Sequence, residues 1–220
     1  MSVVCAALIP AAPLLVPALT GQRGPAQDLR DAALACINEL IDDAPAEIIV
    51  AAEATPTGWH SPTAPLRLDR LGGIGLNDGD DTPLPIPLAI GAALLIGAGW
   101  NSPVRFLALD EGGCLDIFDP LERTGLLLLA NGSARCTDKA PGALHPGAEA
   151  FNAAALNAIT TCDSQALLSI DASTAREQWS DLAGPALLLA TLVDTPPEVT
   201  VRYAGVEAGV QYYCTTMLWA

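Results

Sequence analysis

Four short and almost uninterrupted apolar runs constrain the fold of this chain more than any other feature. They cover residues 3–9, 47–52, 104–110 and 125–130. Apolar runs of this length, without polar alternation, are typical of strands that are covered on both faces, as in a parallel sheet. The pattern therefore predicts a layered domain with these runs at its centre.

Helical periodicity between the runs supports such a layered domain. Residues 27–43 carry apolar side chains at helical spacing after Pro25, which suits a first helical turn. The strand–helix–strand order of this region predicts a right-handed parallel crossover. Further helices are expected at 87–97, 148–160, 164–170 and 174–193, the last with a break or a new first turn at Gly184-Pro185, and closing strands at 199–203 and 209–218. We expect one domain over residues 1–220: an α/β fold, built as a three-layer α/β/α sandwich with a mostly parallel or mixed central sheet.

One long segment shows neither strand nor helix periodicity. Residues 55–81 are rich in Pro, Gly, Asp and Thr, and are expected to form a long loop, with a short strand at 66–71. Long irregular segments of compact domains are typically functional lids or disordered. The glycine cluster at 72–75 lacks the following helix that a dinucleotide-binding motif requires.

Composition excludes several classes of function. The 220 residues hold 25 acidic and 10 basic side chains, a net charge of -15 that repels phosphate, so no nucleic-acid partner is expected. Pro10 and Pro13 interrupt the first apolar run before it could serve as a signal peptide, which favours a cytoplasmic protein. Residues 84–100 fall short of the roughly 20 apolar residues that cross a bilayer, so no membrane partner is expected either. The six cysteines form no C-x-x-C pair and are expected to be reduced and mostly buried.

Three segments carry a family resemblance: Pro10-Ala11-Ala12-Pro13-Leu14-Leu15-Val16-Pro17, Asn131-Gly132-Ser133-Ala134-Arg135, and residues 203–213. Together they resemble the LigB-type class III extradiol dioxygenase superfamily, which includes Memo-like relatives, and the chain looks like a diverged actinobacterial-type member. The resemblance implies a LigB-like fold. It also implies a ferrous ion held by two histidines and a carboxylate, with open positions for substrate and O2.

The first implied iron ligand is missing from this chain. The resemblance places a histidine where Ala11 stands, and neither Ala11 nor Ala12 has a lone pair to donate. His60 follows the second strand, where relatives have their second histidine, and is either a metal ligand with a catalytic role or a surface and packing residue. Four acidic residues are either metal ligands or ordinary acids in solvated turns: Glu53, Asp110, Glu111 and Glu207. With His60, Glu207 could hold a cation, for which Mg²⁺ or Ca²⁺ suits oxygen ligands better than iron.

Two further features carry open alternatives. His145, just before an expected helix, is either a catalytic residue or a capping, solvent-facing one. The segment containing Asn131, Gly132, Ser133 and Arg135 could present backbone N–H groups and a guanidinium to an anion. Its other interpretation is a tight turn that needs Gly132 for backbone reasons.

Loops that leave the carboxyl ends of strands converge at one edge of such a sheet, so Ala11, Glu53 and Asn131 are expected to line a ligand site. The favoured hypothesis is a LigB-like protein that lost its iron site, needs no cofactor, and binds a small molecule or a protein. The alternative is a metal-dependent, extradiol-dioxygenase-like oxidoreductase that uses Fe²⁺ at a rebuilt site around His60. A homo-oligomeric scaffold is a third possibility, because residues 210–219 are rich in aromatic side chains.

Overall fold

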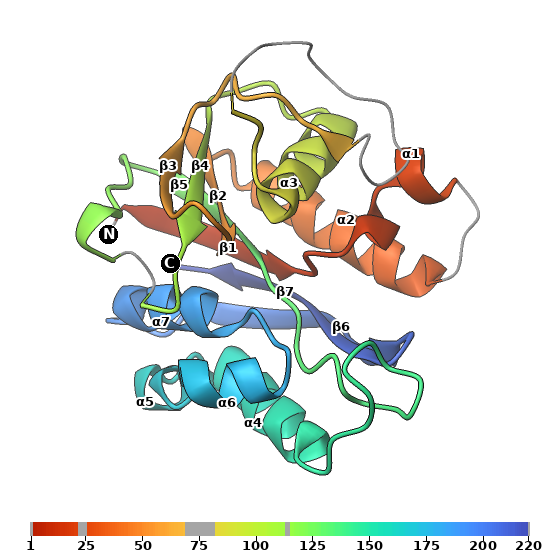
Figure 1. The fold of residues 1–220 in the computed structure, drawn as a ribbon. Coiled ribbons are helices and arrows are strands. Elements are labelled where there is room, and N and C mark those ends of the chain that lie inside the picture. Colours follow the sequence, from red (N-terminus) through yellow and green to blue (C-terminus); the bar gives the residue numbers. More distant parts are fainter. Residues whose placement is uncertain (1, 22–25, 69–81, 113–114, 220) are drawn as a thin grey trace.

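A seven-stranded mixed sheet forms the centre of the protein (Figure 1). The structure is a computed structural model and describes residues 2–21, 26–68, 82–112 and 115–219. Its strands are β1 (Val3–Ile9), β2 (Glu47–Glu53), β3 (Gly58–His60), β4 (Val104–Leu109), β5 (Thr124–Leu129), β6 (Glu198–Glu207) and β7 (Val210–Leu218). Its helices are α1 (Pro17–Thr20), α2 (Gln27–Asp42), α3 (Ile86–Gly97), α4 (Ala148–Thr161), α5 (Ser164–Leu168), α6 (Ala172–Glu177) and α7 (Ala183–Leu192), with short 3-10 turns η1 (Pro13–Leu15) and η3 (Leu115–Ile117).

The order of the strands is β3-β4-β2-β5-β1-β7-β6. The four strands β4, β2, β5 and β1 run parallel, and they correspond to the four apolar runs of the sequence. The remaining three strands pair antiparallel: β3 with β4, β7 with β1, and β6 with β7. The parallel strands are therefore shielded from solvent at both edges of the sheet, as their composition requires.

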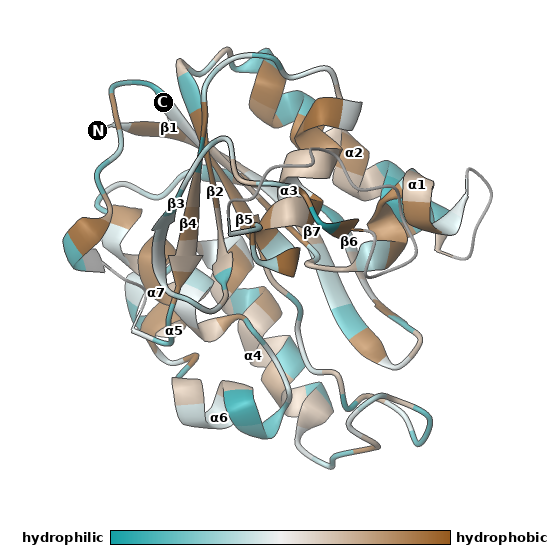
Figure 2. Cartoon of the chain, turned by 45° about the horizontal axis from the view of Figure 1, so that its top comes forward, coloured by the Kyte–Doolittle hydropathy of each residue, from teal (hydrophilic) through white to brown (hydrophobic). Residues whose placement is uncertain are grey.

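Helices cover both faces of the sheet and make three layers (Figure 1). Helices α2 and α3 pack on one face, and α4, α5, α6 and α7 lie on the other. Each parallel strand contributes alternate side chains to the two cores: in β5, Leu127 and Leu129 face α2 and α3, while Leu126 and Leu128 face the other layer. Figure 2 shows the consequence: the central parallel strands are hydrophobic, whereas the edge strand β6 and helices such as α4 and α6 mix hydrophobic with hydrophilic residues.

Helix α2 of the first layer and helix α7 of the second differ in which of their sides are buried. In α2 the buried residues include Leu29, Ala33, Ile37 and Leu40, a stripe at helical spacing, whereas the opposite side is polar. Helix α7 is apolar on all sides, and its residues 183–186 are all buried. A helix of that composition has to be enclosed by other elements.

The structure confirms the predicted α/β fold with three layers and a mixed sheet. It also confirms the new first turn expected at Gly184-Pro185 within 174–193: α6 and α7 are separated by residues 178–182, and the pair lies in the first turn of α7. Three local predictions are corrected. The region expected as a loop contains strand β3, and β6 extends to Glu207 rather than ending at Tyr203. Leu66 makes only an isolated bridge instead of starting a strand, and residues 69–81, with the glycine cluster, lie outside the described residues.

The cysteine prediction is confirmed for the described positions. Cys5, Cys36, Cys162 and Cys214 are buried free thiols, and Cys136 is a half-buried one, while Cys114 lies outside the described residues. Burial raises the pKa of Cys5 and Cys36 to about 12, so these thiols are inert packing groups. Within the described parts of the chain, no helix has the length and hydrophobicity to span a bilayer.

Candidate functional site

The carboxyl end of β5 is the point where the sheet offers a natural crevice. The strands on either side of β5, β1 and β2, are followed by α2 and α3 on one face, whereas β5 is followed by α4 on the other. Where connections from neighbouring strands diverge to opposite faces, a crevice opens beyond the strand ends and ligands bind there. Asn131 lies at this position, two residues beyond the end of β5.

Two carboxyl groups, those of Glu53 and Asp181, accept hydrogen bonds from backbone N–H groups at this crevice. Glu53 ends β2, and its Oε1 accepts a hydrogen bond of 2.6 Å from the Gly184 backbone N–H in the first turn of α7. Asp181 comes from the link between α6 and α7. Its carboxylate accepts hydrogen bonds from the backbone N–H and, at 3.1 Å, from the side-chain amide of Asn131. The acid pair Glu53 and Asp181 thus fastens the second helical layer to the ends of β2 and β5.

The surroundings favour the protonated form of both acids. Burial raises the pKa of Asp181 to about 7, and the charge of Glu53 acts in the same direction, although the two hydrogen bonds from Asn131 oppose it. Burial also raises the pKa of Glu53, against the hydrogen bond from Gly184. A carboxyl group whose pKa lies near neutrality, as that of Asp181 does, is unusual, and such groups concentrate at functional sites.

A cavity of about 320 Å³ lies against Glu53. Its lining residues come from β2, from the loop after β4, and from α6 and the α6–α7 link: Glu53, Glu111, Ala172, Ala175, Arg176, Trp179, Ser180 and Ala183. The Arg176 guanidinium is engaged with the Glu111 carboxylate. The Trp179 side chain is 60% exposed, which leaves an aromatic surface at the cavity. We call this cavity and the acid pair beside it the acid crevice.

The end of β1 contributes no polar side chain. Ala11 is half-buried beside the core under α2 and α3, and Ala12 is buried within it. The chain then turns into η1. Ala11 therefore stands at the sheet edge where the family resemblance expects an iron ligand, and its methyl group packs rather than coordinates.

The structure does not bring His60 and Glu207 together. His60 ends β3, at one edge of the sheet, and Glu207 ends β6, at the opposite edge. With strands spaced by about 4.8 Å, six intervals separate the two edges by roughly 25–30 Å. The His60 Nε2 donates to the Pro56 carbonyl at 2.9 Å, and Glu207 accepts from the Tyr203 hydroxyl at 3.0 Å. A single ion cannot contact both, because ligands must lie within about 2.5 Å of it.

The residues present do not fit the ferrous ion that the resemblance implies. That ion needs two imidazoles and a carboxylate on one side. The described residues contain no group of three or more His, Cys, Asp or Glu side chains arranged to hold a metal ion.

His145 lies at the entrance of α4 and makes structural contacts. Its Nδ1 accepts from the Gly147 N–H at 3.1 Å and faces the Gln178 amide at 2.8 Å, and its Nε2 lies 3.1 Å from the Glu177 carboxylate. Because Nδ1 accepts from the backbone, the ring proton is assigned to Nε2. These contacts agree with the capping interpretation of His145. None of them involves Glu53 or Asp181.

The segment after β5 is a turn whose backbone donors are all engaged. The amides of Gly132 and Ser133 donate to Gln211 O and Asn152 Oδ1, each at 2.9 Å, and the Arg135 amide donates to Ser133 Oγ at 3.1 Å. Arg135 itself donates to two carbonyl oxygens, those of Gly142 and Glu177. No amide in residues 131–135 is left to bind an anion. Gly132 is required for close approach, because a Cβ there would meet the side chains of Asn152 and Gln211 at 2.9 Å.

Of the site residues predicted from sequence, Glu53 and Asn131 meet in the acid crevice, whereas His60, His145 and Glu207 lie elsewhere. Sequence reasoning missed Asp181 and Trp179, since both fall inside the helix expected over 174–193. A signal was present: residues 178–181 are polar apart from the tryptophan and interrupt an otherwise apolar pattern just before Gly184-Pro185.

Comparisons with known proteins bear on the fold. No family model matches the chain, and no curated protein matches it in sequence. Among solved structures, it is similar to the crystal structure of uncharacterized protein JW3007 from Escherichia coli K12, with a TM-score of 0.51 and 15% sequence identity. The similarity covers 98% of this chain and 100% of that one. At this level of identity the comparison shows a shared fold across the whole of both chains.

Proposed function

We propose that this protein is a small-molecule-binding module whose ligand is a compact organic cation held in the acid crevice. The observation that carries the proposal is the convergence of Glu53 and Asp181 at the end of β5, beside a cavity of about 320 Å³. A volume of this size accommodates a small metabolite.

The charges around the crevice favour a cation. Glu53 and Glu111 line the cavity, and Arg176, the one cationic side chain among the described lining residues, is already paired with Glu111. An ammonium group would favour the ionised form of the acid pair, and the exposed Trp179 ring offers a cation–π contact. The net charge of -15 adds a long-range field that attracts cations and repels anions.

We also propose that the chain descends from the LigB-like superfamily and does not retain its iron chemistry. Ala11 at the β1 end and the separation of His60 from Glu207 support this, because they remove the donors that a ferrous site needs. Metal analysis of protein purified without chelator tests it. We expect substoichiometric iron and no ring cleavage of catechols; one equivalent of iron together with catechol cleavage would refute it.

Calorimetric titration with matched probes tests the binding proposal. Butylamine, butanol and butyrate share an alkyl chain and differ in charge, and we expect the amine to bind more tightly than the other two. Glu53 lines the cavity, and Asp181 lies behind the lining and acts on the amine through its charge. Affinity should therefore rise between pH 6 and pH 8, as Asp181 loses its proton near pH 7. Equal affinities for butylamine and butanol would overturn the proposal.

Two variants and one control locate the binding. Glu53→Gln and Asp181→Asn keep an oxygen that can accept from Gly184 and Asn131, so the fold should survive while the charge is lost. We expect each to weaken butylamine binding at least about tenfold, the range of a charge-assisted hydrogen bond. Glu122→Gln removes the same charge from an exposed loop and should leave binding unchanged.

A further inference from the structure

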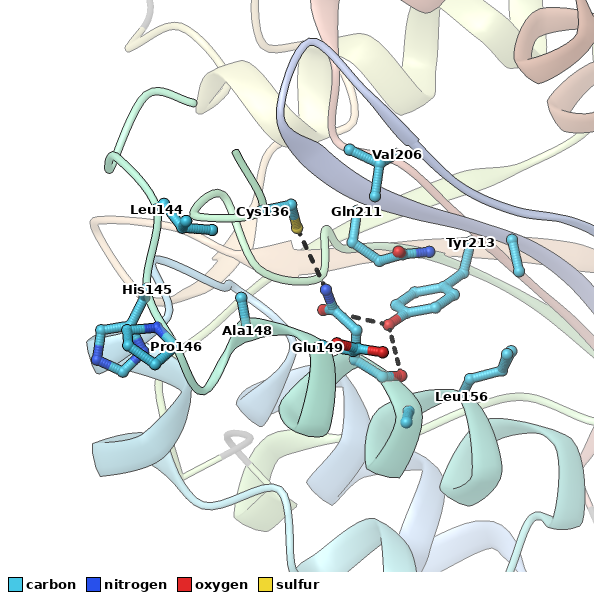
Figure 3. A pocket seen from close by; sticks show the side chains of 13 residues that line it. Cys136, Leu144, His145, Pro146, Ala148, Glu149, Leu156, Val206, Gln211 and Tyr213 are labelled. Carbon is cyan, nitrogen blue, oxygen red and sulfur yellow. Dashed lines mark hydrogen bonds between the residues drawn. The ribbon is translucent and has the colours of Figure 1, made fainter. Parts of the chain in front are cut away.

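A second cavity lies outside the acid crevice. It measures about 640 Å³ and is enclosed by α4, by the β6–β7 hairpin and by the loop that leads into α4 (Figure 3). We call it the hairpin groove. None of the contacts that fasten Asp181 or Glu53 belongs to it, so the proposed function leaves it unexplained.

The walls of the groove are apolar and partly open to solvent. Leu156 of α4 lies on one side, and Val206 of β6 lies on the opposite side, with Leu144 at one end (Figure 3). Ala153 of α4 also lines the groove. The side chains of Leu144 and Val206 are 52% and 45% exposed. Two large apolar side chains held open at the mouth of a cavity are typical of a surface that a ligand covers.

The floor of the groove is rigid because its inner polar groups satisfy one another. The Tyr213 hydroxyl donates to the Asn152 carbonyl at 3.0 Å, the Asn152 amide donates to Cys136 Sγ at 3.3 Å, and that thiol donates to the Ser133 carbonyl at 3.2 Å. Figure 3 shows the first two of these contacts, which connect β7 through α4 to Cys136 in the loop. A preformed floor lowers the ordering cost of binding.

The remaining polar side chains of the lining are His145, whose ring nitrogens contact Gly147, Gln178 and Glu177, and two that offer acceptors to a ligand, Gln211 and the exposed Glu149. Glu149 has no hydrogen-bond or ion-pair partner among the described residues, and Gln211 uses its amide N–H on the Tyr212 carbonyl, which leaves its Oε1 free of described donors. No Lys or Arg occurs among the lining residues that the structure describes. The groove thus pairs apolar walls with a carboxylate and an amide oxygen, and the ligand must supply the donors.

We propose that the hairpin groove binds an aromatic amine, with its ring between Leu156 and Val206 and its ammonium group at Glu149 and Gln211. The apolar walls favour the ring, and the unpaired carboxylate favours a cationic donor over a neutral one. The site is separate from the acid crevice, so it holds whether or not the proposed function is correct.

Matched aromatic probes test the proposal by calorimetry: 1-naphthylmethylamine, 1-naphthylmethanol and 1-naphthoic acid. We expect the amine to bind severalfold more tightly than the alcohol, with the acid weakest, since only the amine forms an ion pair with the exposed Glu149. Glu149→Gln should bring the amine to the level of the alcohol, whereas Glu122→Gln and the crevice variant Glu53→Gln should not. Equal affinities for amine and alcohol, or full affinity in Glu149→Gln, would overturn the proposal.

Protection of Cys136 locates the probe independently of charge. In a Cys114→Ser background, Cys136 is the one described thiol outside the buried core, so a thiol reagent reports on the groove. Amine at a half-saturating concentration for the wild-type protein should slow modification of Cys136, and the same concentration should protect Cys136 clearly less in Val206→Ser. Binding without protection would place the amine elsewhere and refute the assignment. A wild-type protein that is a dimer and becomes a monomer in Val206→Ser would also refute the proposal, because a second copy of the chain would then cover the groove.

Discussion

The acid crevice and the hairpin groove adjoin the two ends of one short segment, residues 131–136, because Asn131 contacts Asp181 and Cys136 lines the groove. The two sites nevertheless differ in almost every physical respect. The crevice is built from strand ends and helix starts, where backbone N–H groups and carboxylates face one another. The groove is built from the sides of α4 and β6, where side chains alone decide its character. Polarity in the crevice therefore follows from the topology of the sheet, whereas polarity in the groove depends on individual side chains, such as Glu149 and Gln211.

This difference indicates which of the two sites contributes to the stability of the fold. The acid pair ties α6 and α7 to the sheet, so changes there should affect folding and binding together. Changes at the mouth of the groove should affect binding alone. Four predictions test this contrast, from the largest expected change in the free energy of unfolding to the smallest.

The pH dependence of stability should reveal Asp181 most strongly. Its pKa is about 7 in the folded protein and 3.8 for the free side chain, so between these values the folded state keeps a proton that the unfolded state has lost. Stability should then fall as pH rises from 4 to 7, by up to about 4 kcal/mol from this group. Asp181→Asn should flatten the curve by that amount, as measured by urea unfolding at pH 4, 6 and 8.

The matched control for this experiment is Glu122→Gln, which should keep the wild-type slope because Glu122 is exposed. If Asp181→Asn and the wild-type protein lost stability in parallel from pH 4 to pH 8, the carboxyl group would titrate as an ordinary surface acid, and the contrast between crevice and groove would weaken.

A methyl group at Gly184 should separate the crevice from the groove. A Cβ there would lie 2.5 Å from the backbone oxygen of Asp110 and 3.0 Å from Glu53, so the start of α7 has to move away from β2. We expect Gly184→Ala to cost about 2–3 kcal/mol in urea unfolding, the usual cost of overpacking, and to abolish butylamine binding. Binding of 1-naphthylmethylamine in the groove should persist.

Gly97→Ala is the control for added bulk, because nothing lies within 4 Å of its Cβ position and the residue ends α3. It should change the free energy of unfolding by no more than about 1 kcal/mol. Loss of groove binding in Gly184→Ala would show that the two sites share one structural support.

The floor of the groove should show an intermediate effect. Tyr213 is fully buried, and its hydroxyl contacts Asn152 on α4. Tyr213→Phe removes that hydrogen bond without leaving a large cavity and should cost about 1 kcal/mol in urea unfolding. Asn152 would then be less firmly held, so 1-naphthylmethylamine should bind severalfold more weakly. An unchanged stability would mean that the floor is not held as the geometry indicates.

The parallel strands were predictable from the apolar runs, because a strand that is buried on both faces has a short, continuous apolar sequence without polar alternation. Residues 3–9 form β1 with those bounds, and β2, β4 and β5 differ from their expected runs by no more than one residue at each end. Strand β3 escaped prediction, since three residues, Gly58–His60, carry no period of their own and pair only through their contact with β4.

The candidate site was predictable in part. Glu53 and Asn131 were expected at the sheet edge because strand ends converge there, but Asp181 reaches Asn131 across fifty residues of chain. Nothing local to Asp181 specifies that contact; it depends on how α6 and α7 dock. The pairing of His60 with Glu207 failed for a related reason. Chain order placed both after strands, while the order of strands in the sheet, set by tertiary packing, put them at opposite edges.

The smallest change in stability should accompany a large change in groove binding. Val206 is 45% exposed on the edge strand β6, so Val206→Ser loses little buried surface and should alter the free energy of unfolding by less than about 0.5 kcal/mol. The same substitution removes one of the two walls that enclose the aromatic ring, and affinity for 1-naphthylmethylamine should fall severalfold while butylamine binding in the crevice stays constant. Calorimetry with both amines on one variant reads the two sites side by side. A fall in butylamine affinity would mean that the sites communicate through residues 131–136, and the groove would then belong to the crevice rather than stand apart from it.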